Sequence, residues 1–149
     1  MIVDCARPIA GCSYEEVASY YEETRDILQD MGYDVLIAMC GKNYLKAEND
    51  FKATGYCYPL STDHAIFQRD LWMCRKCDIL LVNLIGATKV SIGTMMEMAW
   101  AAQDGAHVVT VMEEDNIHQH AFVKEASSVI YNNFQDALDY LSKLAKMEI

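Results

Sequence analysis

The stretch that decides the fold is residues 77–113, CDILLVNLIGATKVSIGTMMEMAWAAQDGAHVVTVME. It begins with a nearly continuous apolar run, residues 78–84, which is typical of a strand buried on both faces of a sheet. After Gly86 comes a polar loop, then a helix-length run that ends before Gly105, and then a second apolar strand over residues 108–112. Because parallel strands require a long crossover connection, this strand–helix–strand order predicts a parallel sheet.

The rest of the chain repeats the alternation of strand and helix. Further strands are predicted over residues 1–6, 33–39 and 127–131, and further helices between Ser13 and Gly32, over residues 64–76 and after Asn132-Asn133. Five strands alternating with helices predict an α/β fold, namely a doubly wound five-stranded parallel sheet with helices on both faces, in a single domain over residues 1–149. Residues 40–60 are the least regular part, and a connection of that length is often a binding loop or lid.

The composition limits the expected partners. Of the 149 residues, 52% are hydrophobic, which is enough for a core and argues against disorder. The formal net charge is −10, so we expect neither a nucleic-acid polymer nor an anionic membrane surface as partner, since both are bound mainly through Lys and Arg. A small anionic ligand needs only a few local donors. No stretch resembles a membrane span or a signal peptide, so we expect a cytoplasmic protein.

Six cysteines are present, and in a cytoplasmic protein we expect free thiols, several of them in the core. Cys74 and Cys77 form a single C-x-x-C motif, which has no second pair at zinc spacing and lies at a predicted helix end. Redox motifs lie instead at helix starts, where the pKa of a thiol is lowered. His118-Gln119-His120 is a weak metal signal on a loop. We therefore predict neither a metal nor a cofactor.

Glu97 is the one ionisable residue that stands out within the decisive stretch. It is placed in the first turn of the predicted helix, among methionine, alanine and tryptophan side chains. A helix that follows a parallel strand starts at the carboxyl edge of the sheet, where α/β folds bind their ligands. Thr94 and Glu97 also have the spacing of a capping box, so the alternative is that the carboxylate only satisfies the start of the helix.

Three segments together point to a family. They are Ala6-Arg7-Pro8 after the first strand, Arg69-Asp70-Leu71-Trp72 with Cys77-Asp78 before the central strand, and Gly93-Thr94-x-x-Glu97-x-Ala99. In order and spacing they resemble the nucleoside 2-deoxyribosyltransferase superfamily, which also contains the nucleoside 5′-phosphate N-hydrolases. The first is similar to a small-residue and proline turn of that family, the second to an Asp-Leu-x-Trp of its hydrolase branch, and the third to its G-[ST]-x-x-E-x-[GA] motif.

The resemblance implies double displacement at the anomeric carbon of a nucleoside. It assigns Glu97 as the nucleophile that forms a glycosyl ester, and Asp70 as the residue that manages protons at the leaving base or positions the base. Transferases usually carry an aspartate six residues before this glutamate, near the sugar 5′-hydroxyl. This chain has Ser91 there, in a Ser-x-Gly context similar to that of the phosphate-binding hydrolases.

Further substitutions bear on the substrate. Arg7 replaces the small residue usual before the proline and adds a fixed cation. Together with Ser91 and the N–H groups near the helix start at Gly93, it favours a 5′-phosphate and hence a nucleoside monophosphate. Asp4 stands where the family often has tyrosine, which bears on sugar contacts and on ribose against deoxyribose.

The resemblance also implies that a neighbouring subunit completes the site. The segment after the fourth strand contains Asn116, His118 and His120, and we expect at least a homodimer in which one or more of them reaches the partner's substrate. The leading hypothesis is hydrolysis of a nucleoside 5′-monophosphate to free base and (deoxy)ribose 5-phosphate. The alternatives are a deoxyribosyltransferase that exchanges bases on deoxynucleosides, and a non-catalytic protein that binds or sequesters nucleotides.

Overall fold

The computed structural model describes residues 1–147. Its elements are β1 (Ile2–Ala6), α1 (Tyr14–Asp30), β2 (Asp34–Ile37), a 3-10 turn η1 (Asn43–Leu45), α2 (Asp63–Lys76), β3 (Ile79–Asn83), α3 (Ile92–Gln103), β4 (His107–Val111), α4 (Ala121–Ala126), β5 (Val129–Tyr131) and α5 (Phe134–Leu144). Every strand pair is parallel, and the order in the sheet is β2-β1-β3-β4-β5. The predicted five-stranded parallel sheet is confirmed.

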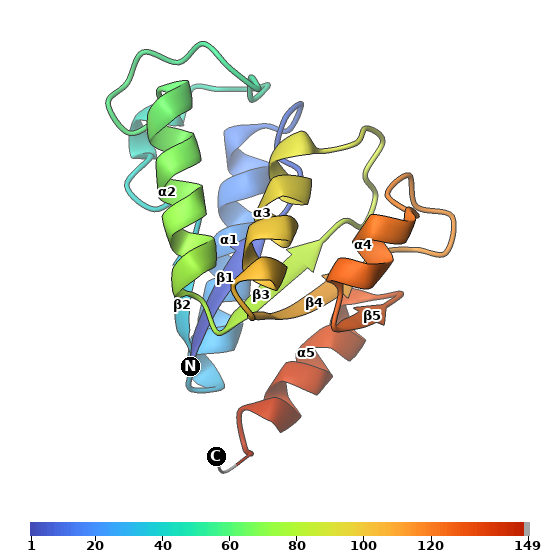
Figure 1. Cartoon of the computed structure of the whole chain (residues 1–149). Helices are drawn as coiled ribbons and strands as arrows, with labels where there is room; N and C mark the ends of the chain where they lie inside the picture. Colours follow the sequence, from blue (N-terminus) through green and yellow to red (C-terminus); the bar gives the residue numbers. More distant parts are fainter. Residues whose placement is uncertain (148–149) are drawn as a thin grey trace.

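Successive residues of the central strands face opposite sides of the sheet. In β3, Ile79 and Leu81 pack into a core with α1 and α5, whereas Leu80 and Val82 pack into a second core with α2, α3 and α4. Helices therefore cover both faces, with α1 and α5 on one and α2, α3 and α4 on the other (Figure 1). This two-sided burial explains why the β3 sequence is a continuous apolar run rather than an alternating one.

Three helices, α1, α2 and α5, begin at the residues that the capping signals indicate. Ser13 and Glu16 form the predicted capping box, in which the Ser13 hydroxyl accepts from the Glu16 N–H at 3.3 Å and the Glu16 carboxylate accepts from the Ser13 N–H at 2.8 Å. Thr62 caps α2, and Asn133 caps α5 with a 2.9 Å bond from the Asp136 N–H. Each cap satisfies a backbone N–H that the helix itself leaves without a partner.

Both β2 and α4 differ from the predictions. The strand predicted over residues 33–39 is shorter, Asp34–Ile37, because its only neighbour is β1 and the register with β1 ends at Cys5 opposite Ile37. The segment after β4 contains a short helix, α4, that we did not predict. Its six residues are too few to show helical periodicity, and its cap is His120, whose Nδ1 accepts from the Phe122 N–H.

The remaining sequence expectations concern the thiols and the long connection. All six cysteines are free, and Cys5, Cys74 and Cys77 are buried, as predicted. Residues 40–60 are irregular apart from η1. Within residues 1–147, none of the helices has the length and apolarity needed to cross a bilayer.

Candidate active site

The topology marks one edge of the sheet as the place for a ligand. β1 and β3 are neighbours, and the chain leaves β1 towards β2 but leaves β3 towards β4 on the other side. In open α/β sheets, ligands bind at the carboxyl ends of the strands where the strand order reverses in this way. The segments that follow β1 and β3 therefore meet at the expected binding edge, together with the start of α3.

α3 begins earlier than the sequence indicated. Its cap is Ser91, whose hydroxyl accepts from the Thr94 N–H at 3.3 Å and bonds to the Thr94 hydroxyl at 2.9 Å. Glu97 is consequently the sixth residue of the helix, in its second turn, and the prediction of a first-turn position is wrong. The capping-box alternative is wrong for the same reason, because Ser91 already caps this helix.

Glu97 and Asp70 lie on the wall of one cavity of about 160 Å³ between α2 and α3. We call it the acid cavity, and its lining residues are Ala53, Asp63, Ile66, Phe67, Asp70, Gly93, Met96, Glu97 and Trp100. Phe67 of α2 meets Trp100 of α3 edge to face, with ring centroids 5.1 Å apart, and so closes one side. Asp70 and Glu97, which lie on different helices, thus share a cavity whose lining contains no lysine or arginine.

A third carboxyl group belongs to the same electrostatic cluster. Asp4 of β1 pairs in register with Leu80 and therefore faces the α2 and α3 side of the sheet. Its side chain is only 4% exposed, and the Cys74 thiol donates a long hydrogen bond of 3.8 Å to its Oδ2. Burial raises the pKa of Asp4 to about 7, and the negative charge of Asp70 contributes to this rise.

The charge balance of the cluster is unfavourable to ionised acids. Burial, then the charges of Asp70 and Asp4, raise the pKa of Glu97 to about 8, while the cations Arg69 and Lys42 act in the opposite direction. Arg69 donates from Nε and Nη2 to the same Asp70 oxygen, at 3.1 and 2.8 Å. An acid that burial and neighbouring charge keep protonated, such as Glu97, next to a second carboxyl group is a setting that general acid–base chemistry uses.

The residues predicted to contact a phosphate do not all line the same cavity. Gly93 lines the acid cavity, and Ser91 is occupied by capping α3. Arg7 lines a separate cavity of about 250 Å³, which we call the basic cavity; its lining residues are Arg7, Pro8, Ala10, Gly11, Cys12, Asn83, Ile85, Gly86, Ala87, Thr88 and Lys89. The Arg7 guanidinium lies 4.5 Å from the centre of the Tyr20 ring, which orients it. The basic cavity has no carboxylate in its lining and is built from the segments after β1 and β3.

Asn116 and His118 are buried and bonded within their own chain. The Asn116 amide donates to the Leu84 carbonyl at 2.7 Å and to Glu113 at 2.6 Å. His118 Nε2 accepts from the Ser91 N–H at 3.0 Å, and its Nδ1 lies 3.0 Å from the Asn116 oxygen, so the ring is the neutral Nδ1–H tautomer. Burial also lowers the pKa of His118.

The two histidines of this segment therefore lie in different settings. The Asn116–His118 network binds the N–H of Ser91, the residue that caps α3. His120, in contrast, is exposed to solvent. A contact of any of the three residues with a partner's substrate stays a prediction.

Comparisons with known proteins identify the family. The sequence model of one family, described as nucleoside 2-deoxyribosyltransferase, matches residues 9–139. The chain belongs to this family. Family members act on N-glycosidic bonds, as transferases or hydrolases. A comparison with curated proteins found no match.

Solved structures share the fold of this family member. A CMP N-glycosidase, BcmB, from Clostridium botulinum has a TM-score of 0.57 at 18% identity, with 97% of each chain covered. A 2-deoxyribosyltransferase from Bacillus psychrosaccharolyticus has a TM-score of 0.65 at 15% identity, covering 94% of this chain and 92% of that one. A 2-deoxyribosyltransferase from Leishmania mexicana has a TM-score of 0.65 at 16% identity, covering 95% of this chain and 97% of that one.

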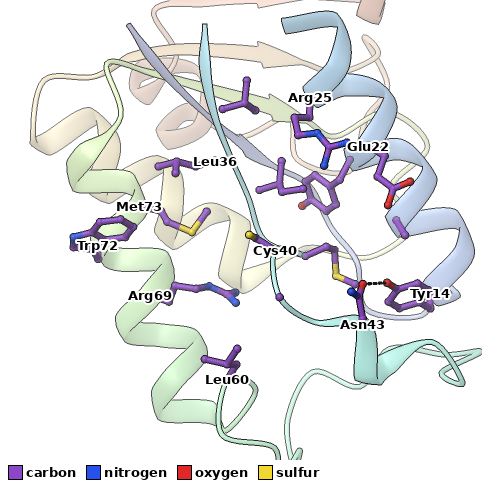
Figure 2. Close-up of a pocket in the computed structure, with 16 residues that line it drawn as sticks. Tyr14, Glu22, Arg25, Leu36, Cys40, Asn43, Leu60, Arg69, Trp72 and Met73 are labelled. Atoms are coloured by element: carbon purple, nitrogen blue, oxygen red, sulfur yellow. Dashed lines mark hydrogen bonds between the residues drawn. The ribbon is translucent and has the colours of Figure 1, made fainter. Parts of the chain in front are cut away.

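In this nucleoside 2-deoxyribosyltransferase family member, a further cavity of about 530 Å³ flanks the edge strand β2. It lies between α1 and α2, with Tyr14, Glu22 and Arg25 on one side and Arg69, Trp72 and Met73 on the other (Figure 2). Tyr14 donates a 3.2 Å hydrogen bond to Asn43 at its rim. Arg69 lines this cavity from α2 (Figure 2), and its guanidinium also bonds to Asp70, which lines the acid cavity.

Sequence reasoning missed two cations that the structure places near the site. Lys89 lines the basic cavity. It belongs to the polar loop after β3, and because loops that follow parallel strands form the binding edge of the sheet, its position could have indicated this. Lys42 is buried although it belongs to the irregular segment after β2. No periodicity marks that segment, so nothing in the sequence distinguished Lys42 from the exposed Lys46 beside it.

Proposed function

We propose that this protein cleaves the N-glycosidic bond of a nucleoside 5′-monophosphate and releases the free base and (deoxy)ribose 5-phosphate. The observation that carries the proposal is that Asp70 and Glu97 line one cavity at the carboxyl edge of the sheet. Family membership supports N-glycosidic chemistry in general. The choice of hydrolysis and of a monophosphate goes further and is supported by the residues around the two acids.

The reaction has two steps. A Glu97 carboxylate oxygen attacks the anomeric carbon while the bond from that carbon to the base nitrogen breaks, and the bonding electron pair stays on the base. Asp70 gives the leaving base a proton. Water then attacks the anomeric carbon, Asp70 takes up a proton from the water, and Glu97 leaves as the carboxylate. The sum is one water consumed, one base and one sugar phosphate released, and both acids restored.

The side chains that line the two cavities differ in the sign of their charge, which supports a substrate with an anionic end. The acid cavity presents carboxyl groups to the reacting sugar, whereas the basic cavity presents Arg7 and Lys89. A 5′-phosphate fits the second of these, because a guanidinium and nearby backbone N–H groups are the donors that phosphate oxygens accept from. An unphosphorylated deoxynucleoside, the substrate of a transferase, has no group that uses these cations.

A homo-oligomer is part of the proposal. Large apolar side chains near the start of α3 and of α4 face solvent, among them Ile92, which is 75% exposed, and Phe122, which is 80% exposed. Val90 and Ile117 extend this surface. Because a contiguous apolar surface is a frequent site of protein association, a second copy of this chain is the partner we propose here.

The test is a panel of ribonucleoside and deoxyribonucleoside monophosphates together with the matching nucleosides, with released base measured by chromatography. We expect base from at least one monophosphate and much less from its nucleoside. Base exchange on unphosphorylated deoxynucleosides in the presence of an acceptor base would favour the transferase alternative. Tight nucleotide binding without any release would favour the non-catalytic one. A sedimentation measurement on the same sample tests the oligomer.

A further inference from the structure

Tyr20 of α1 supports one wall of the basic cavity without lining it. The Arg7 guanidinium lies over the face of the Tyr20 ring, 4.5 Å from the ring centre. Arg7 lines the basic cavity, whereas Tyr20 is not part of its lining. Any effect of Tyr20 on a ligand in this cavity must therefore pass through Arg7.

The Arg7 guanidinium has few other contacts. In the part of the chain that the structure describes, its one hydrogen bond runs from Nε to the Pro8 carbonyl at a long 3.4 Å, and no carboxylate oxygen lies within 4.0 Å of it. Its terminal nitrogens thus remain for a ligand. Because an arginine side chain is long, fixing it on binding costs conformational entropy unless another group already holds it. An aromatic ring face attracts a guanidinium and can do this.

The Tyr20 ring is itself held from two sides. The Tyr21 ring meets it edge to face at 5.3 Å, and the Phe134 ring of α5 packs against it at 5.8 Å. The Tyr20 hydroxyl is buried and has no hydrogen-bond partner among residues 1–147. A buried tyrosine hydroxyl usually has a partner, so the hydroxyl is not what makes this tyrosine useful here. What Tyr20 offers to Arg7 is a fixed ring face.

The second cation of the basic cavity is placed differently. Lys89 is exposed on the loop after β3. Among the described residues, the cations that lie over rings are Arg7 and Lys52, so Lys89 has no such support. A lysine acts as a point charge on a flexible stem, whereas a guanidinium binds phosphate oxygens as a planar fork whose orientation matters. Of the two, Arg7 is the cation that gains from being oriented in advance.

We propose that Tyr20 is a positioning residue of the basic cavity, whose ring face holds the Arg7 guanidinium in the orientation that binds a phosphate group. The inference rests on the proposed function in so far as a sugar phosphate is the ligand of Arg7. It assigns part of the preference for phosphorylated substrates to a residue that does not touch them. The contact of ring and guanidinium can be measured without turnover.

The experiment compares the wild type with Tyr20→Phe, which keeps the ring, and Tyr20→Leu, which removes it. Phe134→Leu is the matched control, because it removes a neighbouring ring from the same core without removing the ring under Arg7. The first readout is the NMR signal of the Arg7 Nε–H group, identified as the one missing from Arg7→Gln. The second is the dissociation constant of ribose 5-phosphate, with ribose as the unphosphorylated control ligand.

We expect the Arg7 Nε–H signal to move in Tyr20→Leu, since a proton above a ring face is shielded by the ring and loses that shielding with it. Tyr20→Leu should bind ribose 5-phosphate about three- to tenfold more weakly, the range of one cation–π contact. Tyr20→Phe should bind within about twofold of the wild type and be no less stable to heat, since it loses only an unpartnered hydroxyl. Phe134→Leu should bind like the wild type.

A second substitution at the same position keeps the test valid if Tyr20→Leu fails to fold. Tyr20→pentafluorophenylalanine retains a ring of similar shape but withdraws negative charge from its face. It should weaken ribose 5-phosphate binding in the same direction as Tyr20→Leu, because attraction of the guanidinium depends on that charge. Unchanged binding in this variant would contradict the inference.

The other outcomes separate the inference from the proposed function. An unchanged Arg7 signal in Tyr20→Leu overturns the inference, as does equal weakening in Phe134→Leu, which would indicate a general packing effect. Weakening in Tyr20→Phe as large as in Tyr20→Leu overturns it as well, because the hydroxyl would then be the active part. A wild type that does not bind ribose 5-phosphate overturns it, even if the protein releases base. The expected pattern in a protein that releases no base from any nucleotide would support the inference and refute the hydrolase.

Discussion

Replacing Glu97 by glutamine should remove activity and, at high pH, raise stability. Glutamine keeps the shape of the side chain but cannot ionise. The pKa of Glu97 rises from 4.5 to about 8 because of burial and the charges of Asp70 and Asp4. A carboxyl whose folded-state pKa is raised binds its proton more tightly in the folded than in the unfolded protein. Folding stability is therefore retained below pH 4.5 and lost progressively as the pH rises to about 8.

The size of this loss follows from the two pKa values. At about 1.36 kcal/mol per pH unit, ionising Glu97 in the folded protein lowers the free energy of unfolding by up to about 5 kcal/mol above pH 8. Because Asp4 titrates beside it and can keep its own proton, we expect about 2–3 kcal/mol in practice. Glu97→Gln should thus be more stable than the wild type by that amount at pH 9 and equal to it at pH 5.

Urea unfolding followed by tryptophan fluorescence at pH 5, 7 and 9 measures this difference. Glu125→Gln is the matched control, since Glu125 is exposed on α4 and its loss should change the free energy of unfolding equally little at each pH. Base release by Glu97→Gln should fall by about 10³-fold or more, as for other variants that lack a nucleophile. The reasoning is refuted if the pH dependence of unfolding is the same for Glu97→Gln and the wild type, or if the variant retains full turnover.

Three further substitutions address other parts of the site. Asp70→Asn should lower kcat by about 10²–10⁴-fold for natural bases, but much less for a p-nitrophenyl glycoside, whose leaving group needs no proton; equal losses for both substrates would contradict the role of proton donor. Arg7→Gln should raise the KM of the monophosphate by about 10–100-fold and leave that of the nucleoside unchanged, as measured by steady-state kinetics. His118→Leu leaves the Ser91 N–H without a partner and removes the ring's bond to the Asn116 oxygen, so the free energy of unfolding in urea should fall by about 1–3 kcal/mol; unchanged stability would mean that the network does not support α3.

The sequence predicted best those elements whose burial in the fold produces a recognisable local pattern of apolar residues. The apolar run of β3 and the glycine-bounded α3 sufficed for a parallel sheet, because only a strand covered on both faces has such a composition. Asp4 could also have been placed from the pattern, since it alternates with Val3 and Cys5 and so had to face the opposite side of the sheet. The convergence of Asp70 with Glu97 came from the family resemblance rather than from periodicity.

What the sequence did not predict depends on contacts between irregular segments. The bond from the Ser91 N–H to His118 joins two loops at the residue that caps α3, and the helix begins directly after it, at Ile92. The burial of Lys42 depends on how the irregular residues 40–60 pack against the rest of the chain. Side-chain contacts of this kind have no period and no fixed spacing, so they can be seen only once the chain is folded.

The different charges of the two cavities bear on how a substrate would be oriented in the proposed reaction. In the proposed reaction, positive charge develops at the anomeric carbon as the base leaves. Asp4, Asp70 and Glu97, whose negative charges repel one another, would gain a cationic neighbour at that moment, so their interaction with the sugar would be stronger in the transition state than before it. A phosphate group in the same cavity would add to the repulsion instead. In the proposed complex, Arg7 and Lys89 would bind the phosphate in a separate cavity, which would orient the nucleotide with its scissile bond towards the acids.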